Sequence, residues 1–132
     1  MRRVLIDTNI YTAFKRNHPA IVESFKHLDF IGIDVTVLAE LYAGFKGGNK
    51  ETINAKELEG FLNTSRVHIL NHNEITAEFY ANIFNVLKNK GQPIPTNHIW
   101  IAASSMQNGL ALFTLDLQHF KEIEGLVLKT DY

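Results

Sequence analysis

The sequence has no cysteine among its 132 residues. This absence excludes a disulfide-stapled scaffold, a zinc–thiolate site and a thiol nucleophile, and it fits a reducing compartment. No charge of either sign dominates, because 13 Lys and Arg stand against 14 Asp and Glu for a formal net charge of −1. The total charge therefore does not predict nucleic-acid binding, although it is compatible with a local basic patch.

Long apolar runs are also absent. The first apolar stretch is only Val4-Leu5-Ile6, which is far shorter than the core of a signal peptide. No window approaches the roughly 20 apolar residues of a membrane span. Repeats, low-complexity tracts and clear linkers are missing too, while 45% of the residues are hydrophobic. We therefore expect a cytoplasmic protein without a membrane partner, folded as a single domain over residues 1–132.

Short apolar runs alternate along the chain with longer segments of helical spacing. Continuous apolar runs of this kind are typical of strands buried on both faces of a parallel sheet. The helical segments include residues 37–45, 75–90 and 99–107, the last with Thr96 or Asn97 as its expected N-cap. The alternation predicts a three-layer α/β sandwich with a mainly parallel central sheet of about five strands. The five runs are residues 4–6, 30–33, 67–70, 111–114 and 126–128.

Ligands of such sheets bind beyond the carboxyl ends of the strands, so polar residues that follow the apolar runs are candidate site residues. Asp7 directly follows the first run, and Asp116 lies just past the fourth. Glu40 stands among apolar residues one turn into its predicted helix, and His98 begins another apolar helix. Each residue also has an ordinary structural explanation. Asp7 would cap a helix, Glu40 would reach solvent from the edge of an apolar stripe, His98 would be a first-turn histidine, and Asp116 a turn residue.

Four motifs in order carry a more specific signal. They are Asp7-Thr8-Asn9, residues 39–44 (AELYAG), residues 94–103 (IPTNHIWIAA), and residues 114–116 (TLD) followed by His119-Phe120. Together they resemble the PIN-domain ribonucleases, and more closely the VapC toxins of type II toxin–antitoxin systems. The resemblance covers essentially the whole chain.

The resemblance implies a metal-dependent endoribonuclease. In that family an acidic cluster holds one or two Mg²⁺ or Mn²⁺ ions, and the metal activates a water that attacks the phosphodiester. Carried over by position, Asp7, Glu40 and Asp116 would be metal ligands or orient metal-bound water. Asn9 and Thr114 would support the cluster by hydrogen bonding, and Asn97 would either do the same or cap its helix.

His98 departs from the family pattern, because relatives carry a third acidic residue at this position. Imidazole is a poor ligand for Mg²⁺ but a reasonable one for Mn²⁺, Fe²⁺ or Zn²⁺. Three hypotheses remain: a working variant with altered metal preference, in which His98 is itself a ligand; a weakened or dead nuclease; or an engineered change that inactivates a toxin. We favour reduced activity, because three carboxylates still converge while the Mg²⁺ ligand set is incomplete.

The resemblance also implies three partners: an RNA substrate, a VapB-like antitoxin lying across an apolar groove, and a second copy in a homodimer. Aromatic and aliphatic side chains of the early helices are candidate groove residues, and they would serve equally well as core. The alternative function is a catalytically impaired PIN-fold protein that acts by binding RNA or antitoxin. A receiver-like phosphate-binding domain is disfavoured, because the first strand ends in one Asp and no glycine-rich phosphate loop is present. The groove candidates are Phe14, Phe25, Tyr42, Phe45, Phe61 and Leu62.

Overall fold

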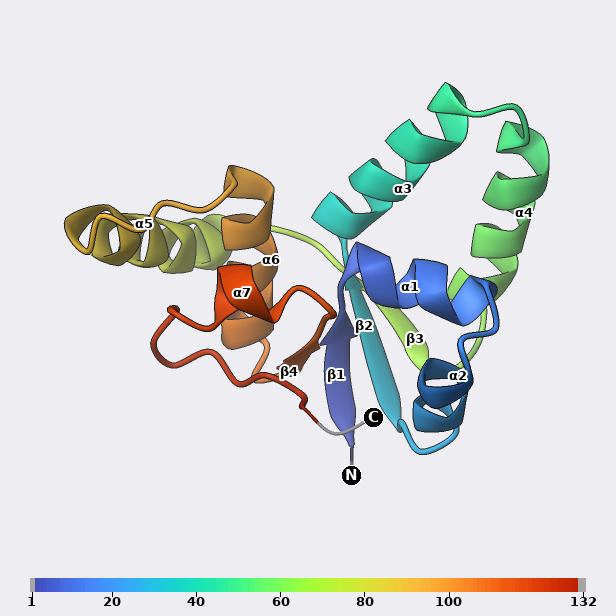
Figure 1. Cartoon of the computed structure of the whole chain (residues 1–132), viewed down its shortest axis with the longest axis horizontal. Helices are drawn as coiled ribbons and strands as arrows, with labels where there is room; N and C mark the ends of the chain where they lie inside the picture. Colours follow the sequence, from blue (N-terminus) through green and yellow to red (C-terminus); the bar gives the residue numbers. More distant parts are fainter. Residues whose placement is uncertain (1, 131–132) are drawn as a thin grey trace.

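The computed structural model describes residues 2–130, and these fold around a parallel sheet of four strands in the order β3-β2-β1-β4 (Figure 1). The strands are β1 (Arg3–Ile6), β2 (Phe30–Asp34), β3 (Val67–Leu70) and β4 (Ala111–Phe113). The helices are α1 (Thr8–Lys15), α2 (Pro19–Phe25), α3 (Val35–Gly47), α4 (Glu51–Leu62), α5 (Glu74–Asn89), α6 (Thr96–Gln107) and α7 (Leu117–Phe120).

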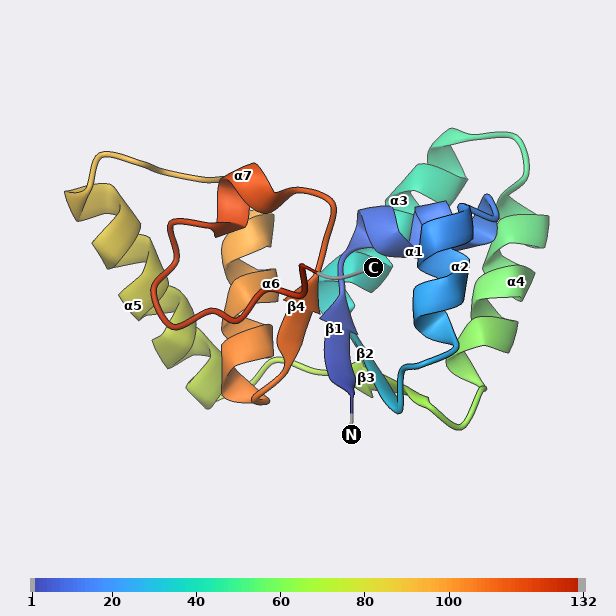
Figure 2. The same ribbon diagram turned by 60° about the horizontal axis from the view of Figure 1, so that its bottom comes forward.

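Helices cover both faces of this sheet, which confirms the predicted three-layer α/β fold. Helices α1 to α4 lie on one side and α5, α6 and α7 on the other in both views (Figures 1 and 2). The chain builds outward from β1 through β2 to β3, and then crosses back to place β4 on the opposite side of β1. Right-handed crossovers in opposite directions put their helices on opposite faces. The carboxyl ends of β1 and β4 therefore flank the point where the strand order reverses, the usual position of a ligand site in such sheets.

The first four apolar runs form the strands where the sequence predicts them. Val4, Leu5 and Ile6 are buried, as are Ile31 and Ile33 on the neighbouring strand, which is why these runs are continuous rather than alternating. The run at residues 126–128 does not become a full fifth strand. It makes one isolated parallel bridge, between Leu112 and Leu128, and leaves Val127 63% exposed. Within residues 2–130, no helix is long and apolar enough to cross a membrane.

Local capping explains where the helices begin. Asp34 caps α3 by accepting a hydrogen bond from the Thr36 amide at 2.9 Å, and Asn73 forms a capping box with Thr76 at the start of α5.

The expectation that Thr96 or Asn97 caps α6 is wrong. This helix begins at Thr96, with Pro95 in the cap position and no side-chain cap. Proline fixes its own φ angle and disfavours helical backbone in the residue before it. The helix can therefore begin directly after Pro95 without a capping side chain. The Asn97 side chain is thereby left for another partner.

Candidate active site

Asp7 lies at the centre of the crevice between β1 and β4. Its backbone amide donates to the Phe113 carbonyl at 2.9 Å, which links the end of β1 to the end of β4. Its side chain caps α1 by accepting a hydrogen bond from the Thr8 amide at 2.8 Å, while the other carboxylate oxygen accepts one from the Thr114 hydroxyl at 2.7 Å. Asp7 is therefore both the helix cap that its position suggests and a fixed carboxylate at the edge of the sheet.

Burial raises the pKa of the Asp7 carboxyl above its ordinary value of 3.8. The Thr114 hydroxyl, the Thr8 amide and the charge of His98 all lower this pKa, and the nearby carboxylate of Glu40 raises it. Burial has the largest effect because a carboxylate loses its hydration when it leaves water. A cation bound beside Asp7 and Glu40 would relieve both the desolvation and the repulsion between the two carboxylates.

Glu40 projects from α3 toward the same crevice and is held there by two side chains. The Thr8 hydroxyl donates to one oxygen of its carboxylate, and the Asn97 amide donates to the other. These donors come from the starts of α1 and α6, so three helices meet at this one carboxylate. Glu40 is therefore a positioned acid rather than a solvated residue at the edge of an apolar stripe.

The segment after β4 forms a small hydrogen-bonded turn around Thr114. Its hydroxyl accepts a hydrogen bond from the Asp116 amide at 2.9 Å and one from the Asn9 side chain at 3.4 Å, while it donates to Asp7. Asn9 in turn accepts a hydrogen bond from the Leu115 amide at 3.1 Å. The supporting residues predicted from the sequence thus join the end of β1 to the turn that carries Asp116.

A cavity of about 530 Å³ opens beside Asn9 and Leu115. Asp7, Glu40 and His98 line it together with the polar side chains at the start of α1. Arg16 and His18 line it from the end of α1 and the loop that follows, where Asn17 adopts the left-handed conformation with φ 58°. Two side chains that can carry a positive charge therefore line the same cavity as the carboxylates.

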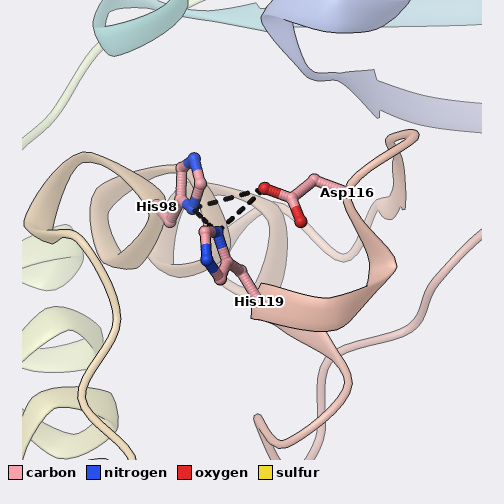
Figure 3. Close-up of side chains that lie close together, drawn as sticks. All are labelled: His98, Asp116 and His119. Atoms are coloured by element: carbon pink, nitrogen blue, oxygen red, sulfur yellow. Dashed lines mark hydrogen bonds and ion pairs between the residues drawn. The ribbon is translucent and has the colours of Figure 1, made fainter.

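Asp116 lies farther along, on the β4 side, where it meets two histidines (Figure 3). One of its oxygens is 2.8 Å from Nδ1 of His119 and 4.0 Å from Nδ1 of His98. His98 therefore links the two halves of the site: it lines the cavity with Asp7 and Glu40, and it lies beside Asp116. Sequence reasoning assigned no role to His119 or Thr8. The Asp-x-x-His spacing, which puts two side chains on one helix face, was the available signal for His119.

Comparisons with known proteins agree with this architecture. A model of the PIN domain matches residues 4–126. The ribonuclease VapC1 of Haemophilus influenzae (strain R2866) is 31% identical over 126 residues, which span 92% of each chain. Among solved structures, VapBC2 from Rickettsia felis, bound to a DNA fragment from its promoter, aligns with a TM-score of 0.88 at 28% identity over 96% of this chain and 97% of that one. VapBC-1 from nontypeable Haemophilus influenzae aligns with a TM-score of 0.86 at 28% identity over 96% of each chain. The chain belongs to the PIN domain family.

Proposed function

We propose that this protein is a metal-dependent endoribonuclease, the toxin component of a toxin–antitoxin pair, acting in the cytoplasm as a single PIN domain over residues 1–132. The observation that carries the proposal is the buried Asp7 carboxylate, which shares one cavity with the positioned carboxylate of Glu40 at the point where the strand order reverses. The similarity to VapC ribonucleases over 92% of the chain supports the same function.

The carboxylates of Asp7 and Glu40 suit a hard divalent cation. Asp7 and Glu40 would hold Mg²⁺ or Mn²⁺ from this cavity, because carboxylate oxygens are the ligands that these ions prefer. Asp116 and His98 are the further ligands predicted from the sequence, but Asp116 lies beside His98 and His119 and does not line the cavity. A bound ion would supply a water activated for attack on the phosphorus and would offset charge on the phosphate oxygens.

The protein's own residues prepare this chemistry by holding the carboxylates in place. Thr8 and Asn97 fix both oxygens of Glu40, and Thr114 fixes one oxygen of Asp7. Arg16 lines the same cavity and would bind a phosphate next to the scissile one. Of the other basic residues near the early helices, Lys15 and Lys46 pair with Glu57 and Glu51, so Arg16 is the better candidate for contacting RNA.

His98 supports a second candidate function, a catalytically impaired protein that binds RNA or antitoxin. Replacing a carboxylate by imidazole removes a negative charge and a Mg²⁺ ligand from the cluster. We favour a nuclease with reduced Mg²⁺-dependent activity, and we expect His98→Asp to raise that activity. If it does not, His98 is not what limits cleavage in Mg²⁺.

The antitoxin partner would lie in a groove between α1, α3 and α4. A hollow of about 550 Å³, lined by Tyr11, Leu41 and Phe45 among others, shares Thr12 and Arg16 with the active-site cavity. Of the predicted groove residues, Tyr42 is 42% exposed, whereas Phe25 is buried in the core. Phe14, Phe45, Phe61 and Leu62 are partly buried against that core. A peptide in this groove would reach the active site directly. We also propose a homodimer, which light scattering on the purified chain would measure.

The test is an RNA cleavage assay on purified, antitoxin-free protein with Mg²⁺, Mn²⁺ or EDTA. Glu40→Gln removes the charge of a positioned acid and keeps its shape, and Glu59→Gln is the matched control because Glu59 is exposed on α4. We expect metal-dependent cleavage that Glu40→Gln reduces at least about a hundredfold and Glu59→Gln leaves unchanged. Absence of cleavage in the parent and in His98→Asp would reject the enzyme and favour the binding function. Cleavage that Glu40→Gln does not reduce would mean that this cavity is not the active site.

A further inference from the structure

The side chains of His98, Asp116 and His119 bring three metal-binding atoms together beside the active-site cavity (Figure 3). Within residues 2–130, they form the one group of three or more histidine or acidic side chains whose ligand atoms all lie within 4.8 Å of one another. Asp7 and Glu40 do not belong to this group. The cluster is therefore defined by two imidazoles and one carboxylate, a different donor set from the carboxylates around Asp7.

The separations within this cluster suit coordination of one ion. Nδ1 of His119 lies 2.9 Å from Nδ1 of His98 and 2.8 Å from the Asp116 carboxylate. Two ligand atoms that are each about 2.1 Å from an ion, at a right angle, are about 3 Å apart. The third separation, 4.0 Å between His98 Nδ1 and the carboxylate, corresponds to a wider angle at the same ion.

Hydrogen bonds alone satisfy this arrangement poorly. Two nitrogens and one carboxylate oxygen face one another, and each neutral imidazole places either a proton or a lone pair on its Nδ1. A proton on His119 Nδ1 would point toward His98 or toward Asp116, but it would not serve both contacts well. A cation accepts lone pairs from all three atoms at once.

Rigid elements hold the three side chains. His98 is in the first turn of α6, directly after the loop that Pro95 ends, and its ring packs 5.0 Å from the ring of the buried Phe120. The Asp116 backbone is anchored by its amide, which donates to Thr114. His119 follows three residues later on α7. The side chains remain partly accessible, with 15%, 31% and 44% of their surface exposed for His98, Asp116 and His119, so an ion could enter and keep open coordination positions.

We propose that His98, Asp116 and His119 form a binding site for a first-row transition-metal ion, of the class of Mn²⁺, Fe²⁺, Co²⁺ and Zn²⁺, that discriminates against Mg²⁺. Two imidazoles and one carboxylate with open positions are a ligand set typical of such ions, whereas Mg²⁺ prefers oxygen ligands and retains its waters. The inference rests on the proposed function only in taking the adjoining cavity as the place where the ion would act. Binding of the ion requires no RNA.

Titration of the full chain, free of a polyhistidine tag, with Co²⁺ tests this site, because the visible absorption of Co²⁺ reports nitrogen coordination. His119→Gln removes one ligand from a half-exposed position. His27→Gln is the matched control, because His27 also lies beside a carboxylate, that of Glu23 at 3.6 Å, but is exposed in the turn that follows α2. His98→Gln provides a second test, and thermal melts show whether each variant is folded.

We expect one Co²⁺ to bind per chain, with an affinity that His119→Gln and His98→Gln each lower at least about tenfold and His27→Gln leaves unchanged. An equal concentration of Mg²⁺ should not displace it. Co²⁺ affinity that is the same in the parent and in folded His119→Gln, or displacement by equimolar Mg²⁺, would overturn the inference and leave a hydrogen-bonded cluster. RNA cleavage measured on the same samples separates the two proposals. Cleavage without His119-dependent binding rejects this metal site alone, and His119-dependent binding without cleavage rejects the nuclease alone.

Discussion

Replacing Thr114 by valine removes a hydroxyl that ties the ends of β1 and β4 together at the active site. Thr114 is completely buried, and its hydroxyl donates to the Asp7 carboxylate at 2.7 Å while accepting from the Asp116 amide at 2.9 Å. Valine has nearly the same shape as threonine, so the change opens no cavity. A hydrogen bond to a charged group contributes about 1.5–3 kcal/mol. We therefore expect Thr114→Val to lower the free energy of unfolding by about 2–3 kcal/mol, which corresponds to a fall in melting temperature of about 6–12 °C for a chain of this size.

The same substitution should impair cleavage, for an electrostatic reason. The Thr114 hydroxyl lowers the pKa of Asp7, so its loss raises that pKa further above the ordinary value. A larger fraction of Asp7 is then protonated at a given pH, and the rise of metal-dependent cleavage with pH should move to higher pH in Thr114→Val.

Thr114→Ser is the control, because it keeps the hydroxyl and removes one buried methyl group, at a cost of about 1 kcal/mol. Chemical denaturation and pH–rate profiles of the three proteins give the comparison. The reasoning is refuted if Thr114→Val is as stable as Thr114→Ser, or if its pH profile coincides with that of the parent.

Three further predictions concern stability. Gly32→Ala should destabilise the protein by about 1–3 kcal/mol in chemical denaturation, because a Cβ there would lie 2.8 Å from Leu70 Cδ1 and 3.1 Å from Leu110 Cδ1; unchanged stability would contradict the packing of β2. Asp34→Ala should lower the free energy of unfolding by about 2–4 kcal/mol, because this fully buried carboxylate caps α3 and contacts His72 Nε2 at 2.8 Å. Asp34→Asn keeps an acceptor for the cap and should lower it less. The third concerns pH in EDTA: because the folded pKa of Asp7 is raised, its contribution to stability is present below the ordinary pKa of 3.8 and is lost as pH rises through the folded value. The stability of the parent relative to Asp7→Asn should therefore fall as pH rises above about 4, and a constant difference would mean that the Asp7 pKa is not raised.

The sequence is informative about the fold because each buried strand is a compact apolar run that needs no distant partner to be recognised. Residues 67–70 form β3 as predicted, and Asp7 and Asp116 follow their strands at the predicted edge of the sheet. The run at residues 126–128 looks the same in the sequence, yet Val127 is exposed and only one bridge forms. Apolar content predicts a strand there, but pairing along the sheet edge decides whether one forms.

The sequence predicts most residues of the site, but it does not predict the contacts between them. Nothing local to Glu40 distinguishes a positioned acid from a solvated one, because its partners Thr8 and Asn97 are 32 and 57 residues away. Asn97 has the residue type of a helix cap, and only the tertiary structure shows that it donates to Glu40 instead. His119 is a local neighbour of Asp116, three residues away, but it acquires His98 as a neighbour only when α6 and α7 come together. Long-range placement of this kind cannot be derived from residue type and spacing.

The most direct test of the central claim is the chemical identity of the RNA ends that the purified protein produces in the presence of a divalent metal. Hydrolysis by an activated water at carboxylates, as proposed for the Asp7 and Glu40 cavity, leaves a linear phosphate on one product and a hydroxyl on the other. The histidines beside this cavity would support a different reaction, in which a base deprotonates the ribose 2′-hydroxyl and a 2′,3′-cyclic phosphate forms. We predict linear phosphate ends from the first turnover, and cyclic phosphate ends would contradict the account.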